Sequence, residues 1–248
     1  MKNKVVLLTI SLSAAMSVNA TVITPDFANV PNGWAADRYA PNSFSDVGTF
    51  EGRNNVLGIG INAGDQQQAT FYDTQGEGYN YVNQQGPGSV LSADLYIPSA
   101  WENSANGLFR SDMWAVGVDA TGTVQDYAVI GFTDQNGTGT YRIWNDQTGI
   151  WTYISSPVAY NAWTSFSISF NGTSFVYSID GTQVGALANS GSTSISEVIM
   201  QAYNFGGTYT ADWSNTPVPE PTTIVAGAML LLPFGLSGLR MLRKSRMA

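Results

Sequence analysis

The sequence predicts an all-β protein whose main domain, residues 21–215, is an antiparallel β-sandwich. Short runs alternate between apolar and polar side chains, which is the period of a strand with one buried face. Gly, Asn, Asp and Pro interrupt these runs at intervals of about 8 to 12 residues. No helical pattern of useful length and no internal repeat occurs between residues 21 and 215. About a dozen short strands in one continuous stretch are typical of a two-layered sandwich.

The first 20 residues predict a secretory signal peptide. Lys2 and Lys4 form a basic start, residues 5–18 an apolar run, and residues 18–20 a small-residue cleavage site. We expect cleavage between Ala20 and Thr21 by signal peptidase, after export through the secretion machinery. A buried first strand is the alternative, but it does not explain the basic start.

The strands of the sandwich follow in order. The odd-numbered positions of residues 91–97 and 175–179 are apolar or aromatic, and so are the even-numbered positions of residues 165–170. Asn171-Gly172 predicts a type I′ turn that joins the last two of these strands. Further strands are expected at residues 56–61, 113–118, 127–132, 141–144, 150–154 and 198–203.

The C-terminal part predicts one transmembrane helix. Residues 222–239 carry no charge and would span about 27 Å as a helix, close to the roughly 30 Å of a hydrocarbon core. The basic residues of the tail 240–248, namely Arg240, Arg243, Lys244 and Arg246, are expected to stay cytoplasmic by the positive-inside rule. The domain then lies outside the inner membrane. A buried core helix would leave the basic cluster unexplained.

The linker 216–221 contains Pro219, Glu220 and Pro221, directly before this apolar span and basic end. The combination resembles the PEP-CTERM sorting signal of Gram-negative bacteria. That resemblance implies processing by the membrane protease exosortase and a place at the cell surface or in an exopolysaccharide or biofilm matrix. An ordinary proline linker into a membrane anchor is the alternative.

Composition excludes several kinds of chemistry. The chain has no cysteine and no histidine, so disulfides, thiolate nucleophiles, Cys/His zinc sites and His-based triads are ruled out. Six of its ten basic residues lie near the termini, and one of its 18 acids is Glu220. The four arginines and 17 acids between them give a net charge of −13, without a lysine. Binding of nucleic acid, which needs Lys and Arg against phosphate, is therefore not expected.

Two local patterns narrow the fold. Residues 163–181, with Trp163, the Asn171-Gly172 turn and Asp180-Gly181, are similar to a hairpin of concanavalin A-like and laminin-G-like jelly rolls. Residues 26–34 resemble the opening of carbohydrate-binding jelly-roll modules, with Asp212-Trp213 on a matching final strand. By this resemblance we expect a jelly roll, and a structural calcium joining Asp26 and Asp212 would be in keeping with it. No other cofactor is expected.

The acidic residues do not predict an enzyme. Hydrolysis of a glycoside needs two carboxylates on one groove, about 5 to 9.5 Å apart. Jelly-roll glucanases carry an E-x-D-x-x-E pattern, which is absent here, and most of the aspartates stand beside turn residues. We therefore expect a non-catalytic domain, with a glycan-cleaving enzyme as the less favoured alternative.

Aromatic residues predict a glycan site instead, because their faces stack on sugar C–H surfaces while polar neighbours bind hydroxyls. The richest cluster is Arg142, Trp144, Trp151 and Tyr153. These four share a face of the sheet if Trp144 lies opposite Trp151, whereas a one-residue slip sends the two tryptophans to opposite faces. Trp101 and Trp114 are weaker candidates for the same groove.

The sequence thus predicts an exported, exosortase-sorted surface or matrix protein whose jelly roll associates with extracellular polysaccharide. The alternative is a structural or adhesive surface protein that binds no glycan. The charge of −13 makes neutral glycans, or acidic ones bridged by divalent cations, easier partners than bare polyanions at long range.

Overall fold

The structure, a computed structural model, describes residues 21–23, 25–67 and 74–215, which belong to one compact unit. None of the helices in this part of the chain is long and apolar enough to cross a membrane. The signal peptide predicted at residues 1–20, the sorting motif Pro219-Glu220-Pro221 and the transmembrane helix predicted at residues 222–239 lie outside the described residues.

The described residues form fifteen strands and three short 3₁₀ turns, in agreement with the all-β prediction. The strands are β1 (Thr21–Ile23), β2 (Trp34–Ala36), β3 (Ser43–Asp46), β4 (Leu57–Ile61), β5 (Thr74–Gln85), β6 (Ser89–Ile97), β7 (Arg110–Val118), β8 (Val124–Thr133), β9 (Thr140–Asn145), β10 (Ile150–Ile154), β11 (Ala162–Phe170), β12 (Ser174–Ile179), β13 (Thr182–Ala188), β14 (Ser194–Tyr203) and β15 (Tyr209–Ser214). The 3₁₀ turns are η1 (Ala63–Asp65), η2 (Ser99–Trp101) and η3 (Ser104–Asn106).

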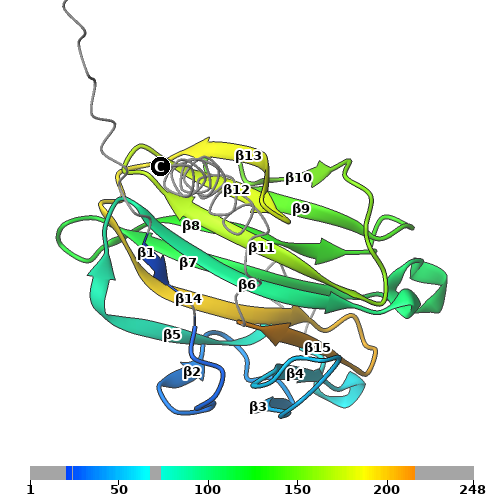
Figure 1. The fold of residues 1–248 in the computed structure, drawn as a ribbon. Helices are drawn as coiled ribbons and strands as arrows, with labels where there is room; N and C mark the ends of the chain where they lie inside the picture. The colour runs from blue at the N-terminus through cyan, green and yellow to red at the C-terminus, as the bar shows by residue number, and fades with distance from the viewer. Residues whose placement is uncertain (1–20, 24, 68–73, 216–248) are drawn as a thin grey trace, which may run out of the picture. The chain divides into compact units, whose positions relative to one another are not determined.

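Two sheets face each other in a sandwich (Figure 1). One has seven strands in the order β10-β9-β8-β7-β14-β5-β2. The other has eight, in the order β13-β12-β11-β6-β15-β4-β3, with β1 added beside β6. The predicted antiparallel arrangement holds for every pair of strands in the described residues except β1 and β6, which run parallel.

The core lies between the sheets and follows the predicted alternation. Every second residue of β6, from Leu91 to Ile97, is buried there against Phe166, Ile168 and Phe170 of β11. From the seven-stranded sheet, Met113 enters the same core. Because side chains alternate along a strand, the neighbours of these core residues point to the outer faces of the two sheets.

The turn between β11 and β12 differs from its prediction. Phe170 pairs with Phe175, so the four-residue turn runs from Asn171 to Ser174 and its central residues are Gly172 and Thr173. Gly172 has φ +93°, and Thr173 does not have a positive φ. A type I′ turn has a positive φ at both central residues, whereas a type II′ turn has it at the first one alone. The predicted type I′ turn is therefore wrong, and the central pair of the observed type II′ turn begins one residue later than predicted.

Candidate functional site

A second hydrophobic cluster lies on the outer face of the seven-stranded sheet, apart from the core. It consists of Trp114 and Val116 on β7, Val129 on β8 and Ile199 on β14, with Tyr127, Trp144 and Trp151 packed against it. Trp114 points outward because its strand neighbours Met113 and Ala115 enter the core. Aromatic side chains on a sheet face that is not covered by the second layer make a surface suited to a ligand.

The β9–β10 hairpin places the four predicted binding residues together. Trp144 pairs directly with Trp151, and Arg142 pairs with Tyr153. Paired residues and their second neighbours share a face, so all four side chains project to the outer face. The ring centroids of Trp144 and Trp151 lie 5.1 Å apart. The register that was open from the sequence is thereby settled, while ligand binding by these residues stays a prediction.

These rings border a pocket with a volume of about 210 Å³. Its lining includes Trp114, Trp144 and Trp151, and the arginines Arg38 and Arg110 reach it from a loop and from the start of β7. The volume is below the roughly 300 Å³ of pockets for drug-sized ligands, which suits a single sugar ring. Trp114, a weaker candidate in the sequence, therefore belongs to the site.

Trp101 does not belong to this site, contrary to expectation. It is buried in the core, and its ring stacks on Phe109 with centroids 5.2 Å apart and an interplanar angle of 10°. The 3₁₀ turn η2 carries Trp101 inward, where it also contacts Phe132 and Tyr209.

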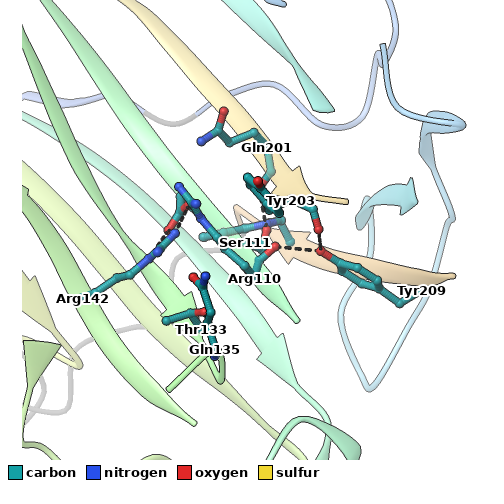
Figure 2. Close-up of polar contacts among 10 residues, drawn as sticks. Arg110, Ser111, Thr133, Gln135, Arg142, Gln201, Tyr203 and Tyr209 are labelled. Carbon is teal, nitrogen blue, oxygen red and sulfur yellow. Dashed lines mark hydrogen bonds and ion pairs between the residues drawn. The ribbon is translucent and has the colours of Figure 1, made fainter. Parts of the chain in front are cut away.

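A buried ion network includes Arg110 and Arg142 (Figure 2), and Arg110 also lines the aromatic pocket. Nη2 of Arg142 lies 2.6 Å from Oδ2 and 2.9 Å from Oδ1 of Asp112, and Nε of Arg110 donates to the same Oδ2 at 2.8 Å. The Arg142 guanidinium also covers one face of Trp151, with Cζ 3.7 Å from the ring centroid. Arg142 thus holds Trp151 in place rather than lining the pocket itself.

Gly131 makes this network geometrically feasible. It stands between Arg142 and Asp112 in the register of β9, β8 and β7. A Cβ at Gly131 would lie 2.7 Å from Cα of Asp112 and would collide with the backbone oxygen of Ser111. Because Gly131 has no side chain, Arg142 on β9 can reach across β8 to Asp112 on β7.

Burial governs the charge state of Asp112. It raises the pKa of this carboxyl to about 6, and Arg110 and Gln201 act in the opposite direction. The Arg142 fork favours the ionised form as well. Gln201 lies on the same outer face (Figure 2), yet within the described residues neither its amide nitrogen nor its amide oxygen makes a hydrogen bond of good geometry.

Three more carboxylates lie near the pocket. Asp146 accepts hydrogen bonds from Nε1 of Trp144 and from the backbone of Tyr127, both at 3.2 Å. Asp37 pairs with Arg38 at 2.6 Å. Burial raises the pKa of Glu197, and the charge of Asp37 raises it further. Burial raises the pKa of Tyr127, and the negative charges of all three carboxylates raise it further.

Some of these residues were missed by sequence reasoning: Arg38, Arg110, Asp112, Tyr127 and Gln201. In the structure Arg110, Asp112 and Trp114 occupy alternate positions of β7 and so share its face, but the strand expected from the sequence began only at residue 113 and left Arg110 and Asp112 outside it. For Arg38 and Gln201 the sequence held no signal, because their proximity depends on which strands become neighbours.

The two residues predicted to bind calcium are Asp26 and Asp212. Asp26 is exposed, and its carboxylate accepts hydrogen bonds from the Ala28 amide at 3.0 Å and from the Asn29 side chain at 2.7 Å. Burial raises the pKa of Asp212 to about 6. In residues 21–23, 25–67 and 74–215, no three Asp, Glu, His or Cys side chains are grouped to hold a metal ion. Calcium binding stays a prediction.

The predicted terminal sites fall almost wholly outside the described part. Thr21 is the first residue of β1, and its amide donates to the Gly88 oxygen at 3.0 Å. Ala20, Pro219, Glu220, Pro221 and the basic residues from Arg240 to Arg246 lie outside it. Cleavage and sorting at these residues stay predictions.

No protein-family model and no curated protein matches this sequence. Solved structures similar to the chain include a carbohydrate-binding module from Bacillus subtilis, with 12% identity, a TM-score of 0.43, and 74% of this chain and 92% of that chain covered. A Bacillus licheniformis β-glucanase has 11% identity and a TM-score of 0.42 over 76% of this chain and 93% of that one.

A prokaryotic β-1,3-1,4-glucanase derived from a mouse hindgut metagenome has 11% identity and a TM-score of 0.45, with 77% and 94% covered. The match to a GH43 protein from Bacillus licheniformis spans only 37% of that chain. At these values the likenesses assign no activity to this protein.

Proposed function

We propose that the sandwich is a non-catalytic glycan-binding domain of jelly-roll type, and that the pocket between Trp114, Trp144 and Trp151 takes a sugar ring. The observation that carries this proposal is the aromatic cluster outside the core, which borders a hollow of about 210 Å³. Aromatic walls with a few fixed polar groups are the usual means of binding a sugar.

The chemistry around the pocket favours binding over cleavage. A general acid or base has to reach the glycosidic oxygen or a water molecule. Asp112 is hydrogen-bonded to two arginines, and both oxygens of Asp146 accept hydrogen bonds from the protein. These contacts give both carboxylates a structural role.

The test is a glycan array probed with the full chain and with Trp144→Ala and Trp151→Ala. We expect the chain to bind at least one glycan, and each variant to lose most of the signal because a wall of the pocket is removed. Trp163→Ala is the matched control, because Trp163 is half-buried like Trp144 and Trp151 but lies on the other sheet. Its ring packs against Tyr96 of β6 and against Phe50. An empty array would instead support a structural or adhesive role.

One observation favours a second candidate, a glycan-cleaving enzyme. Burial raises the pKa of both Asp37 and Glu197, which lie near the pocket, and an acid with a raised pKa is suited to general-acid catalysis. Release of reducing ends or unsaturated products from a bound glycan, abolished in Glu197→Gln, would establish this candidate. Binding without any product supports the non-catalytic proposal.

We further propose that the chain is exported, anchored and then processed by exosortase, which places the domain at the cell surface or in the extracellular matrix. The support is the order of basic start, apolar run, Pro219-Glu220-Pro221, apolar span and basic end. Mass spectrometry of the mature protein should find Thr21 as its first residue and no residues from 222 onward. Recovery of the uncut chain from the cytosol would contradict this proposal.

A further inference from the structure

We propose that the pocket recognises the carboxylate of an acidic sugar, so that the glycan bound is one containing uronic acid. This inference rests on the proposed function and deepens it. It follows from a count of hydrogen-bond donors and acceptors around the pocket, and it runs against the expectation drawn from the net charge of the domain.

Arg110 supplies most of the unused donors. Its side chain is largely buried and lines the pocket, held between the rings of Trp151 and Tyr203 at 5.0 and 5.1 Å. Among the residues that the structure describes, its side chain makes a hydrogen bond through Nε alone, to Asp112. No group in the described part of the chain accepts from its two Nη groups. The pair of Nη groups forms a planar fork that matches the two oxygens of a carboxylate.

Trp114 supplies a second donor. Its side chain is more than nine-tenths buried and lines the pocket, and its Nε1 has no hydrogen-bond partner among the described residues. A buried N–H group without a partner is destabilising, because it has lost its hydrogen bond to water. A ligand oxygen would remove that cost. The Arg38 guanidinium lies over the same ring, 5.0 Å from its centroid, and brings another positive charge to the pocket.

The carboxylate oxygens of Asp112 and Asp146, in contrast, are in use. Asp112 and Asp146 have all four oxygens hydrogen-bonded to protein donors, and Asp37 is paired with Arg38. Among the described residues that line the pocket, Arg110 and Trp114 have donors without partners, whereas both oxygens of the lining carboxylate Asp146 are in use. A sugar hydroxyl can both donate and accept, whereas a carboxylate only accepts. The pocket is matched to the group that only accepts.

The arginines are also concentrated at this place. Of the four in residues 21–215, Arg38 and Arg110 line the pocket and Arg142 stacks on its wall. Their three positive charges oppose the four negative charges of Asp37, Asp112, Asp146 and Glu197, so the pocket region carries about −1 on a domain that carries −13. Long-range repulsion fades within about 8 to 10 Å at moderate salt. Local donors then decide which ligand is held.

The test measures binding by calorimetry with matched pairs of oligosaccharides. Each pair consists of an oligouronate (galacturonate, glucuronate, mannuronate or guluronate) and the same oligosaccharide with its carboxyl groups reduced to hydroxymethyl groups. We expect the full chain to bind at least one oligouronate tenfold or more tightly than its reduced counterpart. Arg110→Lys keeps the charge but loses the fork, and should weaken that binding at least fivefold, as should Trp114→Phe.

Arg53→Lys is the control, because Arg53 pairs with Asp94 and stacks on Trp163 on the other sheet; its affinity should match that of the unchanged chain. Circular dichroism verifies that every variant is folded. Equal or tighter binding of the reduced sugars overturns the carboxylate inference and leaves the proposed function standing. Absence of binding to all pairs and to every glycan of the array overturns both.

Discussion

At the scale of single residues, Asp112 forms ion pairs with two arginines at the site. It is almost fully buried, and both arginines, Arg110 and Arg142, are also buried. A charge taken out of water is tolerated when its partner and hydrogen bonds are in place, and becomes costly when they are removed.

Asp112→Ala should therefore destabilise the protein by about 3 to 5 kcal/mol, because it leaves the Arg142 guanidinium buried without its carboxylate. Urea unfolding followed by tryptophan fluorescence measures the loss. The double variant Asp112→Leu/Arg142→Met removes both charges and should lose less. If the double variant is the less stable of the two, the two side chains do not act as a buried pair.

Asp212 predicts a dependence of stability on pH. Burial raises its pKa from 3.8 to about 6 in the folded protein. The folded state then binds more protons than the unfolded state between these values, so this contribution to stability is complete below pH 3.8 and is lost as the pH rises through 6.

Asp212→Asn removes the ionised form and should stabilise the protein at pH 7 by at most about 1 kcal/mol, since solvent still reaches this partly exposed group. The gain should vanish at pH 4. Asp119→Asn should have the opposite sign at pH 7, because hydrogen bonds from Thr121 and Thr123 lower the pKa of Asp119. Denaturation curves at pH 4 and 7 compare the two. A gain for Asp212→Asn that persists at pH 4 would contradict the assignment.

At the scale of elements, the site depends on how three neighbouring strands are aligned. Arg142, Gly131 and Asp112 form one row across β9, β8 and β7, and Trp144, Val129 and Trp114 form the next. The rings of Trp144 and Trp114 in the second row line the pocket. A substitution in the first row that displaces Arg142 should also displace Trp151, on which Arg142 stacks, and so change the shape of the pocket.

Gly131→Ala tests this alignment. The added methyl group would collide with the Ser111 backbone and crowd Asp112. We expect a loss of about 1 to 3 kcal/mol in unfolding free energy, the usual cost of overpacking. Gly207→Ala is the control, because its methyl group would meet open space, and it should change stability by no more than about 0.5 kcal/mol. Equal stability of the two variants would show that β8 tolerates a side chain in the row.

Strand periodicity predicted most of the strands and their inward faces, but it gave no expectation for β1, β2, β3, β5 or β13. Residues 150–154 were expected as a strand and form β10, and the alternation in residues 91–97 and 165–170 marks the core-facing side chains. The turn at Asn171 shifted by one residue because Asn-Gly suits two turn types whose pairings differ.

The site was predictable only where it is local. Trp144 and Trp151 are joined by a short hairpin, so one register settles their relation. Arg38 and Arg110 come from two distant segments, and only the strand order brings them to the same pocket. Proximity of that kind follows from non-local pairing, which a pattern of residues does not contain.

At the scale of the whole molecule, charge and aromatic residues are distributed unevenly. Acidic side chains are spread over the domain, while three of the four arginines of residues 21–215 gather at one face of one sheet. In the proposal made above, the gathered arginines provide the positive groups that bind an acidic glycan, on a domain whose net charge is otherwise negative. The predicted sorting signal would bring this face into contact with such material.

Nuclear magnetic resonance of the tryptophan indole N–H signals shows whether the outer aromatic pocket holds a sugar. The chain has seven tryptophans, and each gives one signal. On titration with the glycan found on the array, we predict that the signals of Trp114, Trp144 and Trp151 shift while those of Trp34, Trp101, Trp163 and Trp213 stay in place. Shifts confined to the second group would contradict the account.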